Sequence, residues 1–253
     1  MLETYLRDRR KQNDILLMTH IVIGYPSLEA SYDIVKTMAA AGVDLMELQI
    51  PFSEPIADGP VILKANQESL AAGTTVEACM DFSRRVARQF SIPFLFMTYY
   101  NILFKYGVSR FARTMAQNGL QGAIVPDLPP EEGSDYLAAM QEHALAPIFI
   151  YAPTTSEQRM RMIARHAEGM VYCVARKGVT GDKTNFTRDL DAYLSRCRQA
   201  VDLPIALGFG VKDKADVDFL TGKVDIAVIG TQTIRIVEQD GVKAVGDFIR
   251  GLR

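Results

Sequence analysis

The chain has 253 residues, of which 48% are hydrophobic, and a formal net charge of −2. This length and composition suit one large domain with a sizeable core. No basic stretch predicts nucleic-acid binding, no apolar run reaches membrane-spanning length, and the N-terminus lacks the pattern of a signal peptide. We therefore expect a cytoplasmic protein that binds neither nucleic acid nor a membrane.

The thiols and imidazoles show no metal-ligand spacing. The cysteines are odd in number, widely spaced and without a CxxC pair, which indicates reduced thiols: Cys79, Cys173 and Cys197. The histidines are equally scattered: His20, His143 and His166. We expect no metal site.

The chain begins with a segment, residues 1–13, that predicts a helix with a solvated basic face. Short apolar runs then alternate with longer stretches of helical spacing. The runs are brief and partly β-branched, as buried parallel strands should be. Eight strands are predicted at residues 16–23, 44–49, 92–98, 122–125, 146–150, 170–174, 205–207 and 226–229.

Helical spacing recurs between these strands, at residues 28–41, 107–118, 156–166, 213–220 and 241–252. Two further helices, 61–72 and 75–89, both follow the second strand. Alternation of this kind predicts a parallel sheet with helices outside it. The first strand ends in IGYPS, which lacks the GxGxxG pattern of an open dinucleotide-binding sheet. The prediction is one domain over residues 1–253: an α/β (β/α)₈ TIM barrel with an N-terminal helix and an extra helix after strand 2.

The run MELQIPFSEPIADGP, residues 46–60, places a carboxylate inside an apolar strand and another in the loop that follows. Glu47 is costly to bury unless it is paired, and such a setting also tunes a group for proton transfer. Asp58 follows at the carboxyl end of the strand, where TIM barrels build their active sites. Taken alone, the two residues fit either a structural ion pair and a turn aspartate or a catalytic pair.

Glycine-bearing turns follow the last three strands, in RKGVTGDK (176–183), LGFG (207–210) and IGTQT (229–233). Glycine lets backbone N–H groups approach an anion, and a helix N-terminus adds oriented donors. Each turn by itself fits a simple tight connection, but three on adjacent strands favour a phosphate site. The residues thus indicate acid–base chemistry on a phosphorylated metabolite and do not name it.

Motifs in a fixed order resemble the tryptophan synthase alpha subunit family. They are the run 46–60, MTYYN (97–101), YG (106–107), PDLPPEE (126–132), APTT (152–155), GVTG (178–181) and GFG (208–210). Together they span about 200 residues, and their order makes the resemblance specific where any single motif would be weak. The resemblance implies cleavage of indole-3-glycerol phosphate to indole and glyceraldehyde 3-phosphate, a retro-aldol lyase reaction in L-tryptophan biosynthesis.

The resemblance also implies the roles of particular residues. Glu47 would be the general acid/base that protonates indole C3 and helps to deprotonate the glycerol hydroxyl. Asp58 would accept the indole N–H and stabilise the positive charge that develops on the ring. Substrate binding would fall to Tyr172, Thr180, Gly181, Phe209, Gly210, Gly230 and Thr231, of which the last five match phosphate positions.

A partner follows from the same resemblance. Alpha subunits of this family dock on a beta subunit that carries pyridoxal phosphate, forming α₂β₂, so no cofactor is expected in this chain. Residues 51–55 and 101–106 are the candidate docking segments. The long connection 176–185 is expected to close over bound substrate.

Some residues depart from the family pattern. Gln49 stands where the family usually has Gly, and we expect it to crowd the substrate or to hydrogen-bond Glu47. His20 stands where strand 1 often has an aromatic or apolar residue, and a lone strand histidine is more often a hydrogen-bonded core residue. Glu54 replaces Asp, and Thr231 replaces Ser.

Three other functions remain open at this stage. The chain would be a stand-alone indole-3-glycerol phosphate lyase, a non-catalytic alpha-like subunit that activates a beta subunit, or another phosphate-binding barrel such as a sugar-phosphate isomerase. Retention of Glu47 and Asp58 favours catalysis, whereas Gln49 keeps the non-catalytic subunit open.

Overall fold

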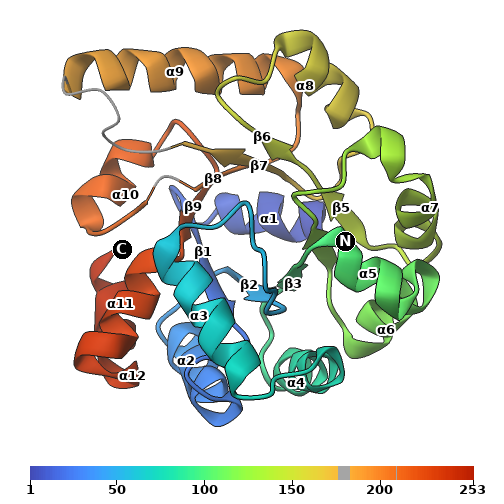
Figure 1. Cartoon of the computed structure of the whole chain (residues 1–253). Coiled ribbons are helices and arrows are strands. Elements are labelled where there is room, and N and C mark those ends of the chain that lie inside the picture. The colour runs from blue at the N-terminus through green and yellow to red at the C-terminus, as the bar shows by residue number, and fades with distance from the viewer. Residues whose placement is uncertain (176–182, 209) are drawn as a thin grey trace.

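The computed structural model describes residues 1–175, 183–208 and 210–253, with the side chains of 183–187 left out. The sequence-predicted residues Thr180, Gly181 and Phe209, and positions 176–182 of the predicted closing loop, lie outside this description. Parallel strands form one sheet around the centre of the molecule (Figure 1). They are β1 (Leu16–Val22), β2 (Leu45–Gln49), β3 (Phe94–Met97), β4 (Gly122–Ile124), β5 (Ala146–Ile148), β6 (Ile150–Tyr151), β7 (Val171–Val174), β8 (Ile205–Gly208) and β9 (Ile226–Ile229).

The sheet order is β5-β4-β3-β2-β1-β9-β8-β7-β6. Its two ends, β5 and β6, are separated in the chain by Phe149 alone, so the ring closes through one interrupted barrel strand. The predicted TIM barrel is confirmed, with one difference: the predicted strand 146–150 is split in two. Each neighbouring pair is parallel, as the alternating sequence pattern requires.

Helices surround the barrel (Figure 1). They are α1 (Leu2–Arg10), α2 (Leu28–Ala40), α3 (Pro60–Ala71), α4 (Val76–Gln89), α5 (Tyr100–Tyr106), α6 (Val108–Asn118), α7 (Ser134–Glu142), α8 (Glu157–Ala164), α9 (Lys183–Ala200), α10 (Lys214–Leu220), α11 (Thr231–Asp240) and α12 (Val242–Gly251). The N-terminal helix and the two helices after strand 2 are confirmed.

The helix boundaries follow side-chain capping. Ser27, Thr75, Ser156 and Asp213 each accept a hydrogen bond from the backbone N–H three residues later, so each helix begins just after its cap. The predicted starts at 75, 156 and 213 were these caps. Helices α5, α7 and α11 were not predicted, and their first turns lack this side-chain signal.

Alternation along the strands separates two apolar layers. On β2, Leu45 packs inside the barrel, whereas Met46 and Leu48 pack outward under the helices. Because successive strand residues point to opposite faces, Glu47 and Gln49 share the inner face with Leu45. On β1, Leu16 and Met18 are inside, so His20 is inside as well.

Helix α1 closes the amino-terminal end of the barrel and lies behind its centre in Figure 1. Its Leu2 and Leu6 pack against the inner layer, and Arg9 pairs with the buried carboxylate of Asp44 at 2.7 Å. This closure leaves the carboxyl ends of the strands as the open end. Within the described part of the chain, no helix combines the length and apolar character needed to cross a membrane.

Candidate active site

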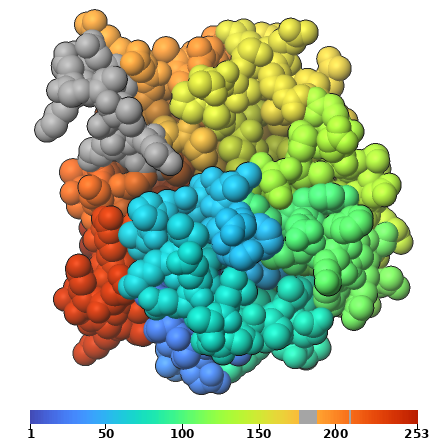
Figure 2. Space-filling model, viewed as in Figure 1, coloured from blue at the N-terminus to red at the C-terminus, as the bar shows by residue number. Residues whose placement is uncertain are grey.

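A pocket of about 490 Å³ opens at the carboxyl ends of the strands. Residues from β1, β2, β7, β8 and β9 and from the loops after them line it, including His20, Glu47, Asp58, Tyr172, Gly208, Gly210, Lys212, Gly230, Thr231 and Arg235. The connection from β2 to α3 and the start of α3, coloured cyan, cover the centre of the face in Figure 2. The pocket therefore lies where the fold class places its active sites.

Glu47 is 2% exposed at the top of the inner apolar layer. Its Oε2 lies 3.2 Å from His20 Nδ1 on the neighbouring strand, where the two residues are in register. Its Oε1 is buried and has no hydrogen-bond partner among the described residues. A carboxylate held on one oxygen and left unsatisfied on the other is suited to exchange a proton with a ligand.

His20 takes its charge state from this neighbour. Burial by itself lowers the pKa of His20, but the hydrogen bond and negative charge of Glu47 outweigh burial, so the pKa is raised above its ordinary value. Burial and the same carboxylate raise the pKa of Tyr172, on β7, well above its ordinary value, so its hydroxyl stays protonated. The upper barrel thus holds a histidine that favours its charged form and a neutral phenol around Glu47.

Asp58 is held by two donors on one oxygen. Gln49 Nε2 donates to Asp58 Oδ2 at 2.7 Å, and the Tyr99 hydroxyl donates to the same oxygen at 3.1 Å. Among the described residues, Asp58 Oδ1 accepts no hydrogen bond, so it remains available for a donor on a ligand. The expectation that Gln49 would hydrogen-bond Glu47 is wrong, because its amide turns to Asp58 instead.

The connection that carries Asp58 is anchored along its length. The backbone N–H of Phe52 donates to the buried side chain of Asn66 at 2.9 Å, and that of Ala57 donates to Tyr99 at 3.2 Å. Phe52 also stacks on Tyr99, with ring centroids 4.9 Å apart. The proline-rich loop is therefore tied to the residue that precedes α5.

The opposite side of the pocket suits an anion. Gly230 precedes α11, whose ten residues begin with Thr231, so free backbone donors and the positive end of the helix dipole face this region. Gly210 has φ +83, and a Cβ there would meet nothing within 4 Å, which leaves open space beside the backbone. Lys212 and Arg235 add positive charge to the pocket lining.

The structure brings together most of the residues that the sequence singled out. Six of them line this one pocket: Glu47, Asp58, Tyr172, Gly210, Gly230 and Thr231. Sequence reasoning missed Lys212 and Arg235. A signal existed for both, because Lys212 directly follows the LGFG turn and Arg235 lies one helical turn beyond Thr231. It also missed Tyr99, which lies on the same face as Met97 just past the end of β3.

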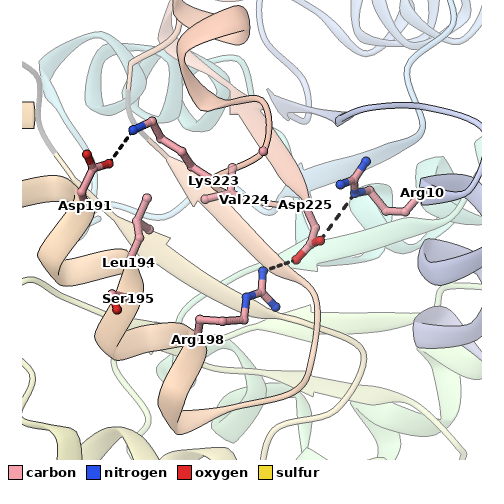
Figure 3. Close-up of a pocket in the computed structure, with 9 residues that line it drawn as sticks. Arg10, Asp191, Leu194, Ser195, Arg198, Lys223, Val224 and Asp225 are labelled. Carbon is pink, nitrogen blue, oxygen red and sulfur yellow. Dashed lines mark hydrogen bonds and ion pairs between the residues drawn. The ribbon is translucent and has the colours of Figure 1, made fainter.

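A second pocket, of about 270 Å³, lies beside α9 and β9 (Figure 3). Its cations are already paired: Arg198 with Asp225 at 2.6 Å, Arg10 with Asp225 at 3.5 Å, and Lys223 with Asp191 at 2.5 Å. These pairs join α1, α9 and β9, so we assign them a structural role. Among the described residues, no group of three or more His, Cys, Asp or Glu is placed to hold a metal ion.

The barrel and the pocket, with carboxylates on one side and anion-binding groups on the other, define a phosphate-binding TIM-barrel enzyme. Comparison with known proteins makes this specific. The model of the family "Tryptophan synthase alpha chain" matches residues 6–248, and the chain belongs to this family.

Individual relatives agree. The tryptophan synthase alpha chain of Syntrophotalea carbinolica is 65% identical over 253 residues, covering 100% of both chains. That of Desulforapulum autotrophicum is 63% identical over 252 residues, again covering 100% of both. Among solved structures, ligand-free tryptophan synthase from M. tuberculosis superposes with a TM-score of 0.91 at 27% identity, covering 99% of this chain and 96% of that one.

Proposed function

We propose that Glu47 and Asp58 carry out the retro-aldol cleavage of indole-3-glycerol phosphate that the tryptophan synthase alpha family catalyses in tryptophan biosynthesis. The chain belongs to this family of lyases. The observation that carries the assignment is the placement of the two carboxylates: each lies at the pocket with one oxygen held by protein donors and the other left without a described partner.

The proposed chemistry divides between the two ends of the pocket. Glu47 protonates C3 of indole, which interrupts the aromatic system and weakens the bond to the glycerol carbon. Asp58 accepts the indole N–H through Oδ1 and stabilises the positive charge that develops on the ring. Lys212, Arg235 and the amino end of α11 hold the phosphate at the other end.

The family further supports a partner, and we propose that the chain assembles with a beta subunit as α₂β₂, in the cytoplasm. Pyridoxal phosphate would belong to that partner, whereas this chain needs no cofactor of its own. We also infer that residues 1–253 form one domain, because α1 and α12 flank a barrel that uses strands from both halves of the chain.

Exposed apolar side chains support a docking face at the predicted segments. Ile56 is 79% exposed in the anchored loop, and Phe104 is 70% exposed on α5. Tyr99, which precedes α5, stacks on Phe52 of the loop and hydrogen-bonds Asp58. A partner bound on α5 and this loop would therefore press on a residue that positions Asp58, and we expect docking to raise the lyase rate.

The deciding experiment measures indole release at saturating substrate, with and without the cognate beta subunit. Glu47→Gln keeps the shape of the side chain but cannot exchange the proton, so we expect activity to fall by about 10²- to 10⁴-fold. Glu54→Gln, which removes an exposed carboxylate from the same loop region, is the matched control and should retain activity.

Three outcomes would change the assignment. Near wild-type turnover by Glu47→Gln would remove Glu47 from the chemistry. Full activity that the partner does not alter would favour a stand-alone lyase. No activity in either state, with beta-subunit turnover still stimulated, would favour a non-catalytic activating subunit.

A further inference from the structure

The starting point is the pairing of two ionisable side chains inside the barrel. His20 and Glu47 are directly opposite each other on β1 and β2, and they are 4% and 2% exposed. Their only hydrogen bond to each other joins Nδ1 to Oε2 at 3.2 Å. The layer immediately below is apolar and includes Met18 and Leu45.

A pair in this setting should be linked through one proton. A buried carboxylate without a partner is costly, and a buried imidazole by itself disfavours its charged form. Sharing one proton across the Nδ1–Oε2 contact relieves both penalties. The remaining atoms, His20 Nε2 and Glu47 Oε1, are buried and have no hydrogen-bond partner among the described residues, although both side chains border the pocket.

We propose that His20 is a positioning residue of the lyase reaction, which stores one proton with Glu47 and orients the carboxylate that transfers it. This inference rests on the proposed function of Glu47. The histidine itself does not touch the reacting carbon; it acts through the carboxylate.

The proton balance closes over one cycle. The pair enters with one proton, which passes through the Glu47 carboxyl to indole C3 and leaves a neutral imidazole beside a carboxylate. That carboxylate then takes the proton of the glycerol hydroxyl as the carbon–carbon bond breaks. The bonding electrons return to the ring, the hydroxyl oxygen becomes the aldehyde carbonyl, and the pair again holds one proton.

The charges around His20 favour this arrangement. Besides Glu47, the carboxylate of Asp58 raises the pKa of His20, whereas burial lowers it. Against its other side, α11 contributes the uncharged Thr233, whose hydroxyl contacts the His20 carbonyl oxygen at 3.5 Å. The remaining titratable groups of the described pocket lining are Tyr172, Lys212 and Arg235.

The first arm of the test measures the pair without any substrate. Because the chain has three histidines, the imidazole resonance of His20 is identified in a proton NMR titration by its loss in His20→Asn. We expect it to titrate above the ordinary histidine pKa of about 6.5 in the wild type and below that value in Glu47→Gln, where burial remains and the counter-charge is gone. Glu54→Gln should leave the His20 titration unchanged.

The second arm measures indole release as a function of pH. Wild-type kcat should fall as the pH rises through the His20 ionisation, because the pair then loses its proton. His20→Asn keeps a donor near the Nδ1 position but cannot ionise, so this limb should move to lower pH and kcat at pH 8 should drop about 10-fold. KM should stay within about 2-fold, since the phosphate groups are untouched. His20→Leu, which removes donor and proton together, should lose more than His20→Asn over the whole pH range.

The two arms separate the possible failures. A His20 titration that is the same in the wild type and in Glu47→Gln would overturn the linkage. An active wild type whose pH profile is unchanged in His20→Asn, with circular dichroism showing both folded, would overturn the positioning role alone. A wild type that releases no indole even with the beta subunit would instead overturn the proposed function, and the titration would still decide whether the two residues share a proton.

Discussion

Gln49 Nε2 lies 2.7 Å from Asp58 Oδ2, so the strand that carries Glu47 also holds the second carboxylate of the pocket. The family pattern usually has Gly at this position, which cannot make such a contact. In this chain the geometry of Asp58 therefore depends on a side chain two residues from Glu47 and on the same inner face of β2.

The first prediction concerns this contact. Gln49→Leu keeps much of the volume but removes the donor, so Asp58 should shift relative to the indole N–H. Misplacement of about 1 Å costs up to ~10²-fold, and we expect kcat to fall by about 10- to 100-fold. Tyr99→Phe, which removes only the longer hydrogen bond to the same oxygen, should cost less. Indole release by Gln49→Leu equal to wild type would show that Tyr99 alone suffices.

The second prediction addresses the anion end of the pocket. A Cβ at Gly230 would meet His20 Cβ at 3.5 Å, an ordinary contact, and the φ of −118 is open to any residue. Gly230→Ala should therefore be tolerated, whereas Gly230→Asp places a negative charge at the start of α11. We expect Asp to weaken binding of glycerol 3-phosphate about 10-fold more than Ala does, through about 1.4 kcal/mol of repulsion.

Calorimetric titration with indole, which has no phosphate, supplies the comparison for Gly230. Indole should bind the Asp and Ala variants alike. If Gly230→Asp bound glycerol 3-phosphate as well as Gly230→Ala, the phosphate would have to lie away from α11.

The third prediction concerns docking. Phe104→Ser should leave the lyase rate of the free chain unchanged and weaken its stimulation by the beta subunit, because it removes an exposed apolar anchor. Leu70→Ser is the matched control, since Leu70 is 36% exposed near the far end of α3, away from the mouth of the pocket. The measurement is indole release with the partner titrated in. Equal half-saturation for wild type and Phe104→Ser would move the docking face elsewhere.

The fourth prediction links pH to stability through Asp225. Partial burial raises the pKa of this carboxyl, but hydrogen bonds from the Ile205 amide and the Arg198 guanidinium outweigh burial and hold the pKa below its usual range. Removing the charge in Asp225→Asn should lower the free energy of unfolding by about 2 kcal/mol at pH 7.

The sign of the pH dependence follows from that lowered pKa. The unfolded chain binds more protons at Asp225 than the folded chain, so the stabilisation is present above the unfolded pKa of about 3.9 and is lost as the pH falls through the folded pKa. Urea unfolding of wild type and Asp225→Asn should therefore converge in acid. Asp191→Asn, whose pair with Lys223 is more exposed, should cost less than about 1 kcal/mol. A gap at Asp225 that stays constant with pH would refute the ionic explanation.

The sequence by itself determined the architecture and the two carboxylates. Alternation of short apolar runs with amphipathic segments is a local property, so it predicted the barrel, the N-terminal helix and the pair of helices after strand 2. Strand parity placed Glu47 on the face of Leu45, and the loop motif placed Asp58 beyond the end of that strand.

Only the tertiary structure decided which side chains meet across strands. The register of β1 against β2 brings His20 to Glu47, and a single residue, Phe149, interrupts the strand that closes the ring. Gln49 turned to Asp58 because the anchored loop folds back over β2, and Arg235 reached the pocket because α11 begins at its rim. Such contacts depend on barrel closure, which joins segments distant in the chain, and no local pattern encodes the distances that result.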